Sequence, residues 1–255
     1  MATYKKRGYK PKNKQEEQQV ENMDSTTAEV FNTLDETASK SEQWIEKNSK
    51  VLFGALVAIV VIFLAFLGYN KYIVEPNELD ASNELAFPRK YFDEAATAGS
   101  GIDSLLTLGL EGADGKYGFL DIADSYSGTD AGNMANYYAG VSYLQMKQYD
   151  KAIEFLSKFD SDDEMLGPVA LGAIGDAFSD IEQEEEALEY YEKAANKKTN
   201  DFTTPLFLYK AGQTAMNLKE YSKAENLFSK IKESYPKSDQ GRDVEKFINA
   251  AKYAQ

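Results

Sequence analysis

The sequence predicts an all-α protein with a single N-terminal transmembrane helix followed by an α-solenoid of helix-turn-helix repeats. Two observations predict this fold class. An uncharged apolar run of 19 residues follows the first 50 residues of the chain, and a run of this length can cross a membrane as a helix. In the second half of the chain, glycine and alanine recur with a period of 35 to 37 residues, which is typical of stacked helical pairs.

The apolar run covers residues 51–69. A helix of 19 residues is about 29 Å long, close to the thickness of the hydrocarbon layer of a bilayer. Trp44 precedes the run and Tyr69 and Tyr72 lie at its end, where aromatic rings prefer the headgroup layer. A buried helix of a soluble domain is the alternative, but such long runs are rare there. The many residues before the run argue against a cleaved signal peptide, so we predict an uncleaved transmembrane helix at 51–72.

Charges on the two sides of the run predict its orientation. The first 14 residues contain six basic side chains and no acidic one, whereas Lys71 is the only basic residue among the 15 that follow the run. The positive-inside rule therefore places the N-terminus in the cytoplasm and residues 73–255 on the opposite side of the membrane. Residues 1–50 carry nine basic and nine acidic side chains, so the net charge of −14 belongs to the rest of the chain.

The segment before the run divides into two parts. Residues 1–25 have many charges and few apolar side chains, so they bury too little surface to fold, and we expect a disordered cytoplasmic tail. In residues 26–50, the apolar side chains of Val30, Leu34 and Ile45 share one face at helical spacing. This pattern predicts an amphipathic juxtamembrane helix.

Composition excludes several function classes. A strongly acidic domain repels nucleic acid and anionic lipid headgroups, because both need a basic surface. The chain contains no cysteine and no histidine, which removes thiolate chemistry, the Ser-His-Asp triad and histidine-ligated metal sites. We therefore predict no catalytic residue, no cofactor and no metal site. An envelope enzyme that uses carboxylate, lysine or tyrosine chemistry stays open as an alternative.

The internal repeat is the most informative signal after the apolar run. Three alanines, each preceded by a glycine twelve residues earlier, mark its register: Gly140 and Ala152, Gly175 and Ala187, and Gly212 and Ala224. Large side chains follow each alanine by four residues: Leu156, Tyr191 and Phe228. This is the pattern of a tetratricopeptide repeat, in which small residues let two helices approach and large ones fill the gap. The pattern is degenerate, since Asn136 replaces a large residue of the first unit.

The repeat register divides the C-terminal domain. We expect units near residues 133–166, 168–200 and 205–237, followed by a capping helix at 239–254. Before them, residues 118–128 match the second helix of a partial unit, and residues 77–98 predict a helix interrupted at Pro88. The Gly-rich residues 99–117 are left unassigned.

The combination of these features resembles the YfgM-like ancillary subunits of the bacterial Sec translocon, in a form familiar from Bacteroidota. The resemblance covers roughly residues 30–255 and rests on the sequences "WIEKNSK", "YNKYIVEPNELDASNELAFPRKYFDEA" and "NMANYYAGVSYLQMKQYDKAIEFLSKF". It implies a single-pass protein of the bacterial inner membrane with a periplasmic repeat domain. It also implies three kinds of partner: the translocon channel subunits, a membrane-anchored peptidyl-prolyl isomerase chaperone, and emerging secretory polypeptides. A repeat scaffold of another envelope complex and a receptor of a mitochondrial membrane are the alternatives.

Repeats of this type line a concave groove with regularly spaced positions of the first helix of each unit. In this sequence the positions are Met134, Tyr137, Val141 and Gln145; Val169, Gly172, Asp176 and Asp180; and Leu206, Tyr209, Gln213 and Asn217. Because Asp176 and Asp180 should repel a C-terminal carboxylate, we expect the groove to hold extended or helical segments with apolar anchors and basic groups. A groove that only spaces the domain is the alternative.

Small residues form a seam along the apolar run. They recur at spacings of four, three, four and three residues: Gly54, Ala58, Val61, Ala65 and Gly68. Such seams let transmembrane helices approach closely, so this one predicts packing against a partner helix. The alternative is that glycine and alanine are simply frequent in membrane helices.

Two acidic stretches could suggest a calcium site or a catalytic site, but we expect both to be solvated surface. The stretch "FDSDDEML" at 159–166 lacks the spacing of a calcium loop, and we expect a solvated loop between repeats. The stretch "IEQEEEALEYYEKA" at 181–194 has enough carboxylates for a glycosidase-like pair, but we expect a solvated helix face.

Overall fold

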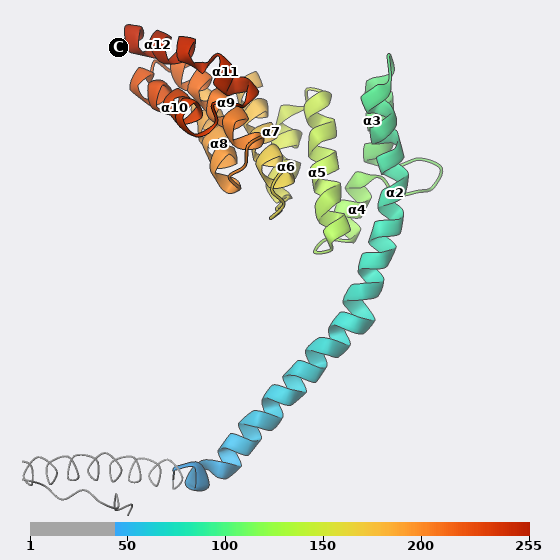
Figure 1. Ribbon diagram of the computed structural model, residues 1–255. Coiled ribbons are helices and arrows are strands. Elements are labelled where there is room, and N and C mark those ends of the chain that lie inside the picture. The colour runs from blue at the N-terminus through green and yellow to red at the C-terminus, as the bar shows by residue number, and fades with distance from the viewer. Residues whose placement is uncertain (1–43) are drawn as a thin grey trace, which may run out of the picture. The chain divides into compact units, whose positions relative to one another are not determined.

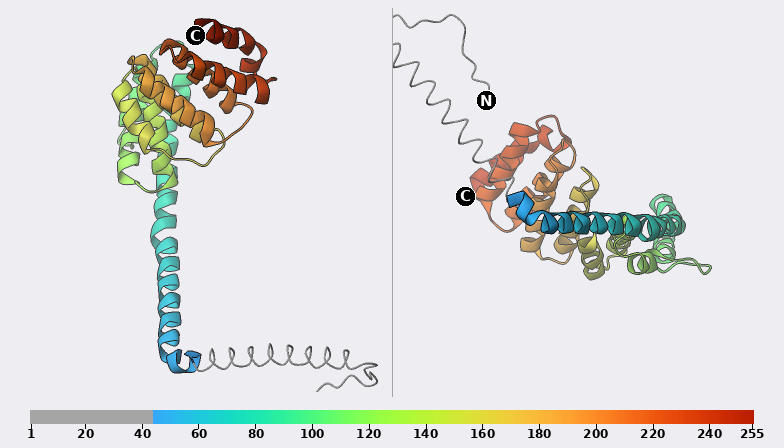
Figure 2. Two further views of the ribbon diagram at one scale, coloured as in Figure 1. Left: turned by 90° about the vertical axis from the view of Figure 1, so that its left-hand side faces the viewer. Right: turned by 90° about the horizontal axis from the view of Figure 1, so that it is seen from below.

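The computed structural model describes residues 44–255, and regular structure within this range is entirely helical (Figure 1 and Figure 2). The predicted all-α fold class is thereby confirmed. The chain divides into two compact units, one ending at Tyr69 and the other beginning at Asn70. The predicted disordered tail, and the juxtamembrane helix up to residue 43, lie outside the described residues.

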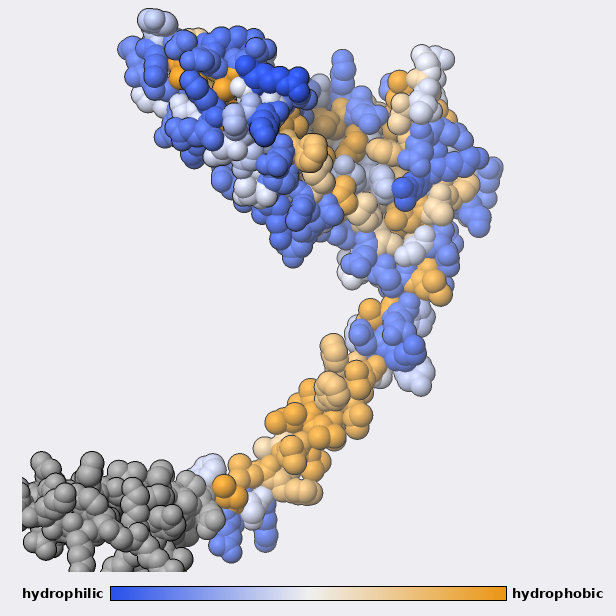
Figure 3. All heavy atoms as spheres, in the orientation of Figure 1, coloured by the Kyte–Doolittle hydropathy of each residue, from blue (hydrophilic) through white to orange (hydrophobic). Residues whose placement is uncertain are grey.

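The first unit supplies the apolar helix. Within the described part of the chain, the helical segment Trp44–Thr97 is the one that contains a stretch long and apolar enough to cross a membrane. Its apolar side chains are exposed, for example Phe53 at 67% and Ile62 at 68% (Figure 3). Contiguous exposed apolar surface of this kind is stable in lipid and costly in water.

The second unit contains twelve helices within the described residues. They are η1 (Asn70–Val74), α2 (Glu75–Thr97), α3 (Ile102–Glu111), α4 (Phe119–Ser125), α5 (Asp130–Gln145), α6 (Tyr149–Lys158), α7 (Leu166–Asp180), α8 (Glu184–Lys197), α9 (Thr203–Asn217), α10 (Tyr221–Ser234), α11 (Asp239–Arg242) and α12 (Val244–Ala254). η1 is a π-helical turn, and Pro76 follows it in the first turn of α2. Because proline has no N–H to donate, it is tolerated at a helix start.

The prediction that Pro88 interrupts its helix is wrong, because α2 continues through it to Thr97. The Pro88 ring is buried, and α3 packs so closely on this point that a Cβ added to Gly109 would lie 3.3 Å from the Pro88 carbonyl oxygen. Burial of the ring and the packing of α3 therefore compensate for the hydrogen bond that the proline cannot make. The Gly-rich stretch before α4 also contains α3, which begins after Gly101 (φ 74°) and ends before Gly112 (φ 79°).

The three helix pairs α5–α6, α7–α8 and α9–α10 pack as the repeat pattern predicts. A Cβ added to Gly140, Gly175 or Gly212 would lie 2.5, 2.7 or 2.5 Å from a large side chain of the paired helix. The side chains concerned are those of Leu156, Tyr191 and Phe228. Each glycine therefore allows a close approach that the partner side chain fills, which is the predicted role of the glycine and of the large residue.

The core follows the stacking of these pairs. One cluster of buried side chains joins α8, α9, α10 and α12, a second joins α3, α4, α5 and α6, and a third joins α6 to α7. α12 buries Val244, Ile248 and Ala251 against the last pair. The expected capping helix at 239–254 is divided at Asp243 into α11 and α12.

Candidate partner-binding groove

The first helices of the three pairs, α5, α7 and α9, carry the predicted groove positions, and α7 contacts both of the others. Each successive pair thus presents its first helix beside the next one, which is how repeats of this kind build a continuous surface. The predicted positions differ in what they contact.

The part of the groove on α5 is apolar. Met134, Tyr137 and Val141 are half-buried and pack against the third core cluster, which includes Phe159. The ring centroids of Tyr137 and Phe159 are 5.1 Å apart, and burial raises the pKa of the Tyr137 phenol. These side chains therefore support the fold with one face and offer apolar surface with the other. Gln145, at the end of α5, is exposed.

The centre of the groove differs from the prediction at Gly172. This residue is buried, and a Cβ added to it would lie 2.0 Å from the ring of Phe207. Gly172 therefore leaves room for the Phe207 side chain of the next repeat and offers no surface to a partner. Its neighbour on the predicted surface, Val169, is half-buried.

Asp176 is the centre of a polar cluster between α7 and α9. Its carboxylate oxygens accept hydrogen bonds from Lys210 Nζ at 2.6 and 2.8 Å, and Oδ1 also accepts one from the Tyr191 hydroxyl at 2.7 Å. Burial, and then the bond to Asp176, raise the pKa of the Tyr191 phenol. The predicted repulsion of a carboxylate by Asp176 is wrong for this position, because Lys210 balances the charge.

Lys210 is the residue that sequence reasoning missed. It lies 34 residues after Asp176, which is one repeat length, and this spacing is the signal that could have found it. The equivalent positions one repeat earlier are Val141 and Ala173, both of which are half-buried and pack against the third core cluster. The surface is thus apolar between α5 and α7 and ionic between α7 and α9.

The remaining predicted positions lie on α7 and α9. Tyr209 is half-buried, with its ring centroid 5.0 Å from that of Phe247, and its hydroxyl accepts a hydrogen bond from Gln213 at 3.1 Å. Asn217 donates to Glu184 at 3.4 Å. Asp180 is exposed and Leu206 is half-buried. The C-terminal ends of α7 and α9 therefore present a carboxylate, that of Asp180, and an amide, that of Asn217.

The acidic loop 159–166 has structural roles. Asp163 Oδ1 accepts hydrogen bonds from the backbone N–H groups of Met165 and Leu166, both at 2.8 Å, and these bonds lower the pKa of its carboxyl. Asp160 forms an ion pair with Lys197 at 2.7 Å, which lowers its pKa. These contacts hold the start of α7 and tie the loop to α8.

Comparisons with known proteins agree with the fold. Residues 134–162 and 207–238 match one tetratricopeptide repeat family, and residues 169–196 match a second family of the same description. No curated protein matches the chain. The matched segments coincide with the three helix pairs, and such repeats generally mediate binding to protein partners. The chain therefore contains tetratricopeptide repeats and has the framework of a protein-interaction scaffold.

Proposed function

We propose that the protein is a non-enzymatic, membrane-anchored accessory subunit of the Sec translocon, and that its groove holds a partner chaperone or an emerging secretory chain. The observation that carries this proposal is the groove on α5, α7 and α9, with an apolar part and a charge-balanced part. The chain also has a helix of membrane-spanning length, and its sequence resembles the YfgM-like translocon subunits.

The chemistry of the groove indicates the class of partner segment. Half-buried apolar side chains such as Tyr137 and Val141 can accept apolar anchors. The exposed carboxylate of Asp180 favours basic groups, because Lys210 is already paired with Asp176. An extended or helical segment that combines apolar and basic side chains fits both parts.

The proposed topology is that of a bacterial inner-membrane protein with a cytoplasmic N-terminus and a periplasmic repeat domain. The nine basic residues before the apolar run support it. Within the membrane, the seam from Gly54 to Gly68 is proposed to pack against a transmembrane helix of the translocon or of the chaperone. A tag at the N-terminus should then resist external protease in spheroplasts, whereas residues 73–255 should be digested. Digestion of the tag alone would contradict the topology.

Affinity purification after mild solubilisation of membranes tests the function. The wild type should retain translocon channel subunits and a membrane-anchored prolyl isomerase in stoichiometric amounts. Gln145→Arg and Gln213→Arg add a cation to exposed groove positions, so they should weaken recovery of a basic partner about tenfold through like-charge repulsion. Asn226→Arg, an exposed position on α10, is the matched control and should leave recovery unchanged.

Two results would contradict the proposal. Recovery of a different set of envelope proteins would favour a scaffold of another complex. Recovery that is equal for the groove variants and for Asn226→Arg would mean that the groove only spaces the domain.

A further inference from the structure

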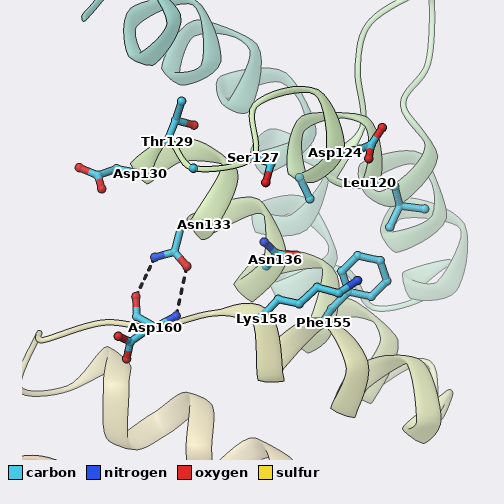
Figure 4. A pocket seen from close by; sticks show the side chains of 12 residues that line it. Leu120, Asp124, Ser127, Thr129, Asp130, Asn133, Asn136, Phe155, Lys158 and Asp160 are labelled. Carbon is cyan, nitrogen blue, oxygen red and sulfur yellow. Dashed lines mark hydrogen bonds between the residues drawn. The ribbon is translucent and has the colours of Figure 1, made fainter. Parts of the chain in front are cut away.

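A second concave site lies between α4, α5 and α6. It is a pocket of about 640 Å³, a volume in the range of small-ligand sites. Its walls include Leu120 of α4, Asn136 of α5, and Phe155 and Lys158 of α6 (Figure 4). None of the predicted groove residues lines it. Because consecutive residues of a helix point about 100° apart, Asn136 and its neighbour Tyr137 belong to different faces of α5.

The repeat pattern explains why this pocket is open in the first unit. Asn136 precedes Gly140 by four residues, and the same position of the next two units is held by Leu171 and Leu208. Both leucines pack with the first core cluster. The Asn136 side chain has less apolar surface than leucine, and its amide nitrogen donates a hydrogen bond to the Gly132 carbonyl of the preceding turn at 3.2 Å. The space that a leucine fills in the other units is therefore open in this one.

Acidic side chains outnumber basic ones around the pocket. Lys158 forms an ion pair with Glu154 at 2.7 Å, and its Nζ lies 4.6 Å from the centre of the Phe155 ring. Asp124 and Asp130 also line the pocket, on opposite sides of it (Figure 4), and within the described part of the chain neither forms an ion pair. The result is an apolar side, formed by Leu120 and Phe155, in a pocket whose lining contains more carboxylates than ammonium groups (Figure 4).

We propose that this pocket binds an arginine or lysine side chain presented by a protein partner, at a site separate from the groove. The aliphatic stem of such a side chain can lie along Leu120 and Phe155, and its cationic head can reach Asp124, which lies on the same side of the pocket as Leu120 (Figure 4). Long basic side chains commonly bury the stem and keep the charged end at a polar rim. The net charge of −14 of the chain attracts the same class of partner over longer distances.

A peptide-binding titration with the full chain in detergent micelles tests this proposal. The probe is a short fluorescein-labelled peptide with a central arginine between leucines, and the matched peptide has citrulline, the neutral isostere, in place of arginine. Fluorescence anisotropy should show that the arginine peptide binds the wild type about tenfold more tightly, with the difference falling at high salt.

Asn136→Leu restores the residue type of the other two units and fills the pocket. It should weaken binding of the arginine peptide about tenfold while the melting temperature stays equal or rises. Asn226→Leu makes the same chemical change on exposed α10 and should bind as the wild type does. The double variant Asp124→Asn and Asp130→Asn should lose the preference for arginine over citrulline.

Because a peptide of this kind also fits the groove, the comparison is repeated in the Gln213→Arg background. Asn136→Leu should still weaken binding of the arginine peptide about tenfold there, so failure of the groove and failure of the pocket are distinguishable. The proposal is overturned if Asn136→Leu binds the arginine peptide as well as the wild type, or if the wild type does not distinguish arginine from citrulline.

Discussion

Glu78 joins the first long helix of the second unit to the start of the repeats. Its Oε2 accepts a hydrogen bond from the backbone N–H of Asp130 at 2.7 Å, and its Oε1 accepts one from that of Ala131 at 3.1 Å. Thr129 caps the next N–H, that of Gly132, at 2.9 Å. A carboxylate on two free N–H groups at a helix N-terminus is stabilised by both the hydrogen bonds and the helix dipole. We therefore expect Glu78→Ala to destabilise the second unit.

The expected loss in the free energy of unfolding follows from the geometry of these hydrogen bonds. A hydrogen bond to a charged group contributes about 1.5 to 3 kcal/mol when buried, and loss of a helix cap costs about 0.5 to 2 kcal/mol. Because Glu78 is half-buried, solvent screens part of this, and we expect a loss of about 2 kcal/mol. Glu78→Gln keeps an acceptor oxygen but loses the charge, so it should lose about half as much.

Thermal unfolding followed by circular dichroism, with the full chain in detergent micelles, measures this effect. For a domain of this size, about 2 kcal/mol lowers the melting temperature by about 4 to 8 °C. Glu75→Ala is the matched control, since Glu75 lies on the same helix and contacts exposed Lys71. Its melting temperature should equal that of the wild type within error. Equal melting temperatures for Glu78→Ala and Glu75→Ala would refute the reasoning.

Three further predictions concern other parts of the chain. Gly172→Ala places a methyl group against the Phe207 ring and should cost about 2 to 3 kcal/mol in denaturant unfolding; Phe207→Leu should recover part of the loss, and a strictly additive double variant would contradict the contact. Asp163→Ala should lower the melting temperature at neutral pH. Because the folded-state pKa of Asp163 lies below 3.8, the difference in melting temperature between wild type and variant should persist above that pH and disappear as the pH falls below it. A difference that does not depend on pH would argue against the cap. In the membrane, Ala58→Leu should release the protein from its complex during purification whereas Phe63→Ala should not, and equal recovery would make the helix an anchor alone.

The sequence was sufficient for the helix pairs because their contacts are short-range and repeated. Each repeat glycine contacts a side chain 16 residues later, as in Gly140 and Leu156, so the same spacing appears three times in the chain. The apolar run needed only length and the absence of charge. The spacing of the glycines therefore identifies the repeats even though other positions of the repeat vary.

The missed features depend on contacts between different elements. Pro88 was expected to interrupt a helix, but the packing of α3 at Gly109 supports α2 through that point. The glycines around α3 allowed no assignment of residues 99–117 from sequence, whereas in the structure Gly101 and Gly112 mark the two ends of this helix. Asp176 was predicted to be an unbalanced charge because its partner lies in the next repeat.

Site-specific photo-crosslinking in intact membranes tests most directly whether the groove holds a protein partner. A photoreactive amino acid at the exposed groove positions Gln145 and Gln213, or at Asn226 as the control, is activated before the membranes are solubilised, and the adducts are identified by mass spectrometry. The account predicts discrete adducts from both groove positions, containing a translocon subunit, a prolyl isomerase or a secretory chain, and none of these from Asn226. Adducts of these proteins from Asn226 alone, or no protein adduct from either groove position, would contradict it.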